Sequence, residues 1–132
     1  MPLDPLNSDV VLIVDDIPEN LSLLHDALDE AGYTVLVATN GESALQRARQ
    51  SRPDVILLDA LMPGMDGFEV LGTLNERGID IPVIVLTADI QETARKKCIQ
   101  MGAVDFLNKP PNDDELKAAM EKALAFKEEK LP

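Results

Sequence analysis

The chain has 132 residues, 45% of them hydrophobic, which predicts a single domain with one buried core. Its 24 acidic residues outnumber its 12 basic ones, and the net charge of −12 argues against direct nucleic-acid binding, because phosphates need a basic face. Cys98 is the one cysteine, the first residues lack the regions of a signal peptide, and no apolar run approaches the roughly 20 residues of a membrane span. These features indicate a soluble cytoplasmic protein without membrane insertion.

Short apolar runs alternate along the chain with longer amphipathic segments. Strands are predicted at residues 10–14, 34–39, 54–58, 82–86 and 104–107. Helices are predicted at residues 18–31, 41–51, 66–77, 89–101 and 112–129. Such strict alternation predicts a doubly wound α/β fold, in which helices cover both faces of a parallel sheet. We expect residues 1–9 to be a loose leader and 10–129 to form the domain, with no effector domain after it.

Acidic residues follow two of the predicted strands. Asp15 and Asp16 come directly after residues 10–14, and Asp59 follows 54–58. The carboxyl ends of parallel strands share one edge of the sheet, where open α/β sheets bind ligands, so the three carboxylates should converge there. A strand end should also push Asp59 out of the core. Taken alone, Asp15 or Asp16 fits equally well as the cap of the first helix.

Three clustered carboxylates need a compensating charge. Each pair at ~4 Å repels by roughly 4 kcal/mol at an effective dielectric near 20. A hard cation would supply the compensation, and Mg²⁺ suits a site of carboxylate and carbonyl oxygens that leaves room for water. Zinc would need histidine or thiolate ligands, and the one histidine, His25, falls on the first helix, where we expect an ordinary surface residue.

Two further polar residues stand at the same predicted edge. Thr87 ends the fourth strand and Lys109 follows the fifth, so a hydroxyl and an ammonium should face the acids. Each also has a structural explanation: Thr87 as a helix cap, and Lys109 as an ion-pair partner of the acids. Their coincidence with three acids on four strand ends favours a functional site.

Taken together, these residues resemble the receiver domains of two-component response regulators. The likeness runs from about Val10 to Phe126. The matching pieces are Val14-Asp15-Asp16, Leu58-Asp59, Met62-Pro63-Gly64-Met65-Asp66-Gly67, Leu86-Thr87-Ala88 and Lys109-Pro110. The chemotaxis receiver has the flavodoxin-like strand order 2-1-3-4-5. The resemblance therefore implies this order for the five strands of the present chain, as a (βα)₅ fold.

The resemblance also implies roles for individual residues. The family position matched by Asp59 accepts a phosphoryl group from the phosphohistidine of a histidine kinase. By this likeness Asp16, Asp59 and the backbone carbonyl of Leu61 would hold Mg²⁺ directly, and Asp15 would act through a water molecule. Thr87 would bind a phosphoryl oxygen.

Lys109 would share with Mg²⁺ the neutralisation of the phosphoryl charge. Phe106 resembles the aromatic switch of the family and fits a plain core residue equally well. The family also implies a cis bond before Pro110. Pro111 departs from the family pattern, so the last helix is expected to start later or to enter at a different angle.

The signal would leave by contact with another protein, since no effector domain is expected. The phosphoryl donor would be a histidine kinase or phosphotransfer protein acting in trans, and the sequence does not identify the downstream target. Arg95, Lys96 and Lys97 form a basic cluster that fits either a contact face or a solvated face.

Two other functions were weighed against the phosphoacceptor. An aspartyl phosphatase of the haloacid dehalogenase type would carry Asp-x-Asp after its first strand, whereas this chain has Asp15-Asp16-Ile17 there. An inert receiver-like adaptor would be favoured by the loss of Asp59, Thr87 or Lys109, and all three are present. The sequence therefore favours a phosphoacceptor signalling module rather than a dedicated enzyme.

Overall fold

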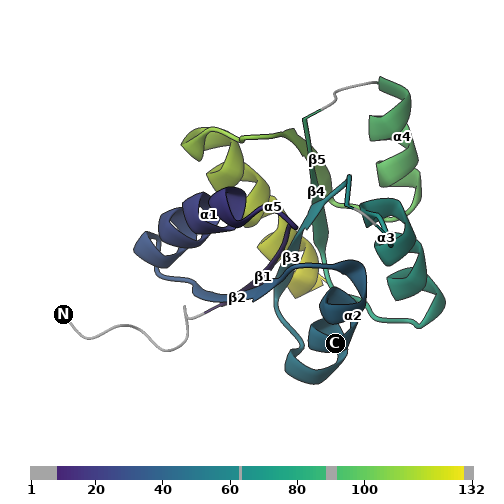
Figure 1. Cartoon of the computed structure of the whole chain (residues 1–132). Helices are drawn as coiled ribbons and strands as arrows, with labels where there is room; N and C mark the ends of the chain where they lie inside the picture. Colours follow the sequence, from purple (N-terminus) through teal and green to yellow (C-terminus); the bar gives the residue numbers. More distant parts are fainter. Residues whose placement is uncertain (1–8, 63, 89–91, 130–132) are drawn as a thin grey trace.

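The computed structural model describes residues 9–62, 64–88 and 92–129, so most of the expected leader lies outside it. Strands and helices alternate throughout the described residues (Figure 1). The strands are β1 (Val10–Val14), β2 (Thr34–Ala38), β3 (Val55–Asp59), β4 (Val83–Thr87) and β5 (Asp105–Asn108). The helices are α1 (Pro18–Glu30), α2 (Gly41–Ser51), α3 (Gly67–Glu76), α4 (Glu92–Gln100) and α5 (Asp113–Glu129). Among the described residues, no helix has the length and apolar character needed to cross a membrane.

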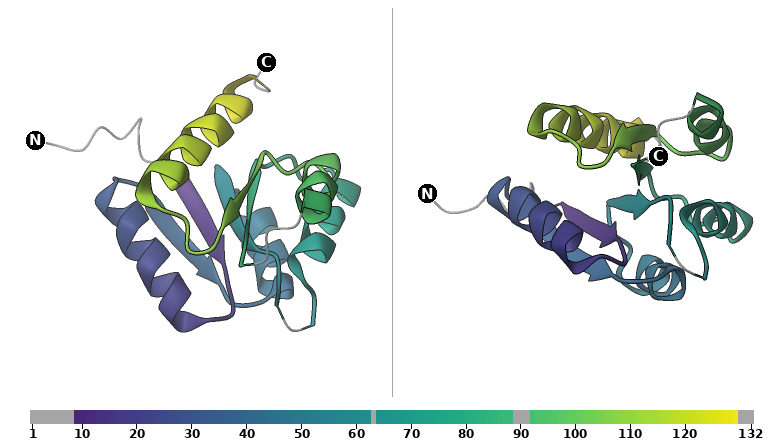
Figure 2. Two further views of the ribbon diagram at one scale, coloured as in Figure 1. Left: turned by 90° about the horizontal axis from the view of Figure 1, so that it is seen from above. Right: turned by 45° about the horizontal axis from the view of Figure 1, so that its top comes forward.

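The five strands form one parallel sheet in the order β2-β1-β3-β4-β5. This confirms the doubly wound fold and the implied strand order. Alternate residues of the inner strands face opposite layers. Leu12 and Ile56 pack with α2, α3 and α4, whereas Ile13 and Leu57 pack with α1 and α5. The sheet is thus covered on both faces, by α2, α3 and α4 on one side and by α1 and α5 on the other (Figure 2).

Local sequence signals account for the helix starts. Three side-chain oxygens before a helix accept a backbone N–H three residues later: Asn40 from Ser43 at 2.8 Å, Asp66 from Glu69 at 2.9 Å and Asn112 from Glu115 at 2.7 Å. Asp66, expected as the first residue of a helix, is instead the cap of α3. The last helix begins at Asp113 rather than at residue 112, because Asn112 serves as its cap.

The helix-cap explanations for three of the edge residues do not hold. The residue before α1 is Ile17, which provides no side-chain cap, and Pro18 opens the helix. The Asp15 carboxylate instead accepts the backbone N–H of Ile17 at 2.9 Å, so neither Asp15 nor Asp16 caps the helix. Thr87 is the last residue of β4 and Ala88 follows in a bend, so Thr87 is not next to α4 either.

Candidate functional site

The three acids predicted to converge do so at the carboxyl ends of β1 and β3. Carboxylate oxygens of Asp15, Asp16 and Asp59 all lie within 4.8 Å of one another. Asp15 and Asp59 are only 1% and 4% exposed. The expectation that the strand end pushes Asp59 out of the core was therefore wrong. The start of α3 packs against the backbone of Asp59, and the Lys109 ammonium lies against its carboxylate.

Lys109 joins two of the three acids. Its Nζ lies 2.6 Å from Asp15 Oδ2 and 3.1 Å from Asp59 Oδ2. β5 ends at Asn108, directly before this lysine, and the backbone N–H of Lys109 donates to the carbonyl of Thr87 at 2.8 Å. Lys109 is thus an ion-pair partner of Asp15 and Asp59, as one of its two explanations expected. It supplies part of the compensation that the crowded acids require.

The ionisation of this cluster reflects competition between burial and charge. Burial raises the pKa of Asp59, repulsion from Asp15 raises it further, and Lys109 only partly offsets these effects. Burial lowers the pKa of Lys109, but the adjacent carboxylates of Asp15 and Asp59 outweigh burial and raise it overall. Lys109 therefore stays cationic, whereas holding Asp59 as an anion costs the folded protein free energy.

The other predicted site residues lie around this cluster. The Asp59 carboxylate accepts the backbone N–H of Leu61 at 3.3 Å, and the Leu61 side chain is 63% exposed. Thr87 is buried at the end of β4, next to β3 in the sheet. Phe106 is buried in the core beneath α2, α3 and α4. The peptide bond before Pro110 is cis, as the resemblance implied.

Two glycines shape the site, and the sequence analysis assigned neither a role. A Cβ at Gly67 would lie 2.5 Å from the Asp59 carbonyl oxygen, so only glycine lets α3 begin this close to the end of β3. A Cβ at Gly41 would meet the Met65 side chain at 2.8 Å. The glycine therefore lets Met65, in the β3–α3 loop, pack closely against the start of α2. Gly67 ends the stretch Met62–Gly67 that resembles the receiver family, but nothing in the sequence indicates its contact with the Asp59 backbone.

The cluster has the donor set of a magnesium site. Mg²⁺ prefers carboxylate oxygens and retains water, and the cluster offers three carboxylates, of which Asp16 is half-buried and so accessible to solvent. Asp15 Oδ2 is buried, and within the described residues no hydrogen bond of good geometry reaches it. An oxygen satisfied by charge alone fits a site built to bind a cation.

The remaining candidates lie away from the cluster. His25 is on the exposed surface of α1 next to Asp26, as expected. Arg95, Lys96 and Lys97 are exposed on α4, and the Lys97 ammonium lies 4.7 Å from the centre of the Phe68 ring on α3. The basic cluster is thus on the surface, with one of its members fixed against α3.

Comparison with known proteins agrees with this site. The response regulator receiver domain model matches residues 11–121. The chain therefore belongs to the response regulator receiver domain family, a signalling family of two-component systems. Receiver domains bind Mg²⁺ at an acidic pocket, and the Asp15, Asp16 and Asp59 cluster has this character.

Relatives differ in how much of their length this chain covers. It is 34% identical over 122 residues to the alkaline phosphatase synthesis transcriptional regulatory protein PhoP of Bacillus subtilis, covering 92% of this chain and 51% of that protein. It is 38% identical over 117 residues to protein PilH of Pseudomonas aeruginosa, covering 87% and 97%. The receiver domain of a LuxO repressor protein of Vibrio parahaemolyticus superposes with a TM-score of 0.87 at 32% identity, covering 92% and 94%. The chain thus spans about half of PhoP and nearly all of PilH.

Proposed function

We propose that this protein is a phosphoacceptor whose Asp59 takes a phosphoryl group from the phosphohistidine of a histidine kinase or phosphotransfer protein. The observation that carries this proposal is the placement of Asp59 between a lysine ammonium at 3.1 Å and two further carboxylates within 4.8 Å. An anionic nucleophile with a cation beside it and a cation-binding donor set around it is suited to phosphoryl transfer.

The chemistry follows from charge. A carboxylate oxygen of Asp59 forms the new P–O bond while the P–N bond of the donor breaks, and the electron pair returns to the imidazole nitrogen. The Lys109 ammonium neutralises charge on the transferring oxygens. Bound Mg²⁺, held by Asp16, Asp59 and the Leu61 carbonyl with Asp15 acting through a water, would neutralise the rest.

Thr87 and Phe106 are proposed to convert phosphorylation into a change of shape. The Thr87 hydroxyl would bind a phosphoryl oxygen. Thr87 and Phe106 belong to neighbouring strands, where Thr87 pairs with Asn108 and Val85 with Phe106. Movement of the threonine is therefore transmitted directly to the strand that carries the aromatic ring.

The signal is proposed to leave by protein contact from a receiver unit spanning residues 10–129. Arg95 and Lys96 are exposed on α4, beside the strand that carries Phe106. They are the basic side chains we assign to this contact face. Slow self-dephosphorylation would end the signal, so the protein acts as a switch rather than as a dedicated enzyme.

The test is intact mass after incubation with Mg²⁺ and acetyl phosphate. One phosphate adduct is expected on the wild type and none on Asp59→Asn. Asp114→Asn, which removes an exposed acid in the first turn of α5, is the matched control and should keep the adduct. An adduct that survives Asp59→Asn, or no adduct with several small phosphodonors, would instead support the adaptor function.

A further inference from the structure

A groove lies between α1 and α5, on the sheet face opposite α2, α3 and α4. It has a volume of about 470 Å³. Leu28 of α1 and Leu116 and Met120 of α5 form its buried floor. Ala27 and Ala31 line the α1 side, and their short side chains leave room above the floor.

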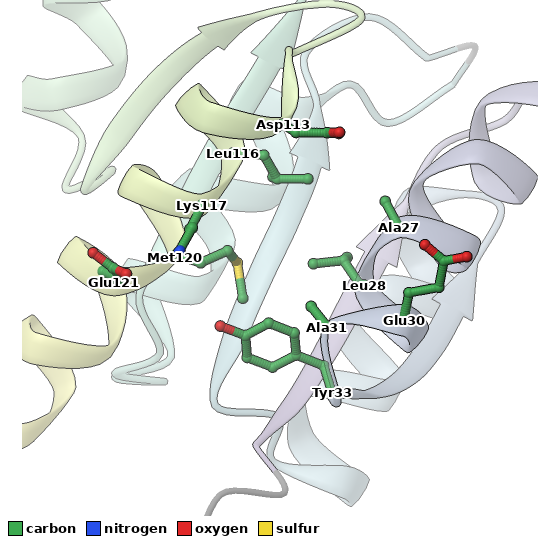
Figure 3. Close-up of a pocket in the computed structure, with 10 residues that line it drawn as sticks. All are labelled: Ala27, Leu28, Glu30, Ala31, Tyr33, Asp113, Leu116, Lys117, Met120 and Glu121. Carbon is green, nitrogen blue, oxygen red and sulfur yellow. The ribbon is translucent and has the colours of Figure 1, made fainter.

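Tyr33 adds an aromatic ring to this apolar floor. Figure 3 shows the ring between the two helices, with its hydroxyl directed towards α5. Burial raises the pKa of Tyr33, and the negative charges of Asp9 and Glu121 raise it further. The Tyr33 end of the groove is therefore both apolar and electronegative.

Acidic side chains outnumber basic ones around the floor. Glu30, Asp113 and Glu121 line the groove together with one base, Lys117, and all four are exposed. α1 adds no compensating charge, since it contains no lysine or arginine. An occupant with positive charges on either side of an apolar side chain would match this surface. A second copy of this chain is disfavoured, because each copy has a net charge of −12.

The two acids on α5 set the spacing of the charges that an occupant needs. Asp113 and Glu121 are eight positions apart in one helix, which is about 12 Å along its axis. Leu116 and Met120 lie between them in the helix. An extended segment rises about 3.3 Å per residue and directs alternate side chains to one face. Five extended residues with a base at each end and an apolar residue at the centre would thus present all three side chains to the groove, with the charges about 13 Å apart.

The α1 side of the groove is remote from the acid cluster. α1 begins at Pro18, three positions after Asp15, whereas its last turns and Tyr33 line the groove. The 13 residues of α1 extend over about 20 Å, so the two sites approach opposite ends of this helix. A segment bound in the groove therefore need not cover Asp59, and the groove is distinct from the surface that a phosphoryl donor must reach.

We propose that the α1–α5 groove docks an extended segment of another protein, in which two basic residues flank a central aliphatic side chain. The aliphatic side chain packs on Leu116, Met120 and Tyr33. The basic residues pair with Asp113 and Glu121. The complex is weak and short-lived, because the apolar floor is small and exposed ion pairs contribute little free energy.

The probe for this site is the peptide acetyl-Lys-Ala-Leu-Ala-Lys-amide. Tyr33 reports its binding, since the protein has one tyrosine and no tryptophan and the peptide has neither. We expect a change in Tyr33 emission that saturates with a Kd of about 0.1–1 mM and weakens as salt is added. The control peptides acetyl-Lys-Ala-Ser-Ala-Lys-amide, which lacks the apolar side chain, and acetyl-Glu-Ala-Leu-Ala-Glu-amide, which reverses the charges, should bind about tenfold more weakly.

Charge-neutralising variants separate the groove from the overall charge of the protein. Asp113→Asn/Glu121→Gln should weaken binding of the probe about fivefold, because both proposed ion pairs are lost. Glu42→Gln/Glu76→Gln changes the net charge by the same amount at exposed positions of α2 and α3, and should bind the probe like wild type.

Backbone amide signals of the isotope-labelled protein locate the bound peptide. Shifts are expected at Leu28, Tyr33 and Met120, and not at Asp16 or Leu61 on the carboxyl edge. No saturable binding, control peptides that bind as tightly as the probe, equal loss in the two variants, or shifts confined to the carboxyl edge would overturn the proposal. Shifts at the same three groove residues that depend on protein concentration without peptide would instead make a second copy of the chain the occupant.

Discussion

The four apolar residues of β3 and the acid that ends the strand are buried to nearly the same extent, but burial affects their free energy in opposite ways. Val55, Ile56, Leu57 and Leu58 are at most 1% exposed, and Asp59, the next residue, is 4% exposed. The apolar residues lose little by leaving water, and a buried leucine side chain contributes about 1.5–3 kcal/mol to stability. The carboxylate gains nothing comparable, since burial raises its pKa. The strand thus stabilises the fold along its length and carries a costly reactive group at its end.

The same contrast is present on β1. Val14 and Asp15 are adjacent and each is 1% exposed, yet Asp15 needs Lys109 at 2.6 Å to balance its charge. Burial therefore stabilises the fold in the body of the sheet, whereas at the carboxyl edge burying a carboxylate costs free energy. Truncating an apolar side chain in the body of the sheet should therefore lower stability, whereas neutralising a carboxylate at the edge should raise it.

The largest expected effect comes from the body of the sheet. Leu57→Ala removes a fully buried side chain packed against α1 and α5, and should cost about 2–5 kcal/mol of unfolding free energy. The carboxyl edge is unchanged, so phosphate uptake at a temperature where the variant is folded should be retained. Urea unfolding and intact mass on one preparation test both points. Loss of uptake in the folded variant would mean that the body and edge are not separable.

Removing the lysine should destabilise the edge by less. Lys109→Met leaves Asp15 and Asp59 facing each other without their shared cation, at a cost of about 1–2 kcal/mol in the metal-free protein. Mg²⁺ should bind this variant more tightly than wild type, because the competing ammonium is gone. Calorimetric titration with Mg²⁺ measures this, with Lys117→Met on exposed α5 as the control. Weaker Mg²⁺ binding would show that the ammonium does not compete with the metal.

The sequence predicted the body of the sheet better than its edge. Apolar runs located all five strands to within two residues at each end. The signal is strongest for β1, β3 and β4, because strands buried on both faces are apolar at nearly every position. The convergence of Asp15, Asp16 and Asp59 also followed, since strand ends share one edge. The burial of Asp59 did not follow, because Lys109 after β5 and the start of α3 meet this strand end only in the folded chain.

Long-range side-chain contacts explain the remaining misses. The contact between Gly41 and Met65 joins α2 to a loop 24 positions later in the chain. Neither residue has a local sequence pattern that indicates this contact. The groove between α1 and α5 likewise joins helices from opposite ends of the chain. Such pairings arise only when the sheet order brings the elements together.

Neutralising the reactive acid should have a smaller effect of opposite sign. Asp59→Asn removes the charge that burial and Asp15 oppose, so the melting temperature without metal should rise by about 2–4 °C. Mg²⁺ should raise it further in wild type than in the variant, because the variant lacks one ligand.

The pH dependence of this gain has a defined sign. The native pKa of Asp59 is raised, so ionisation costs stability at neutral pH, and this cost is lost as pH falls through the native pKa. The advantage of Asp59→Asn should therefore shrink in acid. Thermal melts at neutral and acidic pH, with chelator and with millimolar Mg²⁺, measure both effects. A metal-free variant less stable than wild type at neutral pH would contradict a crowded acid cluster.

The smallest effect on stability, with a functional consequence, is expected at Leu61. Its side chain is 63% exposed at the edge, so Leu61→Asn should leave the melting temperature nearly unchanged. Its backbone N–H bonds the Asp59 carboxylate at 3.3 Å, which holds the residue beside the proposed acyl phosphate. An apolar side chain there cannot orient an attacking water, whereas an amide can. Dephosphorylation of Leu61→Asn should therefore be faster than that of wild type, as measured by the decay of the phosphate adduct after the donor is removed. Unchanged or slower decay would mean that Leu61 does not control the access of water to the phosphoryl group.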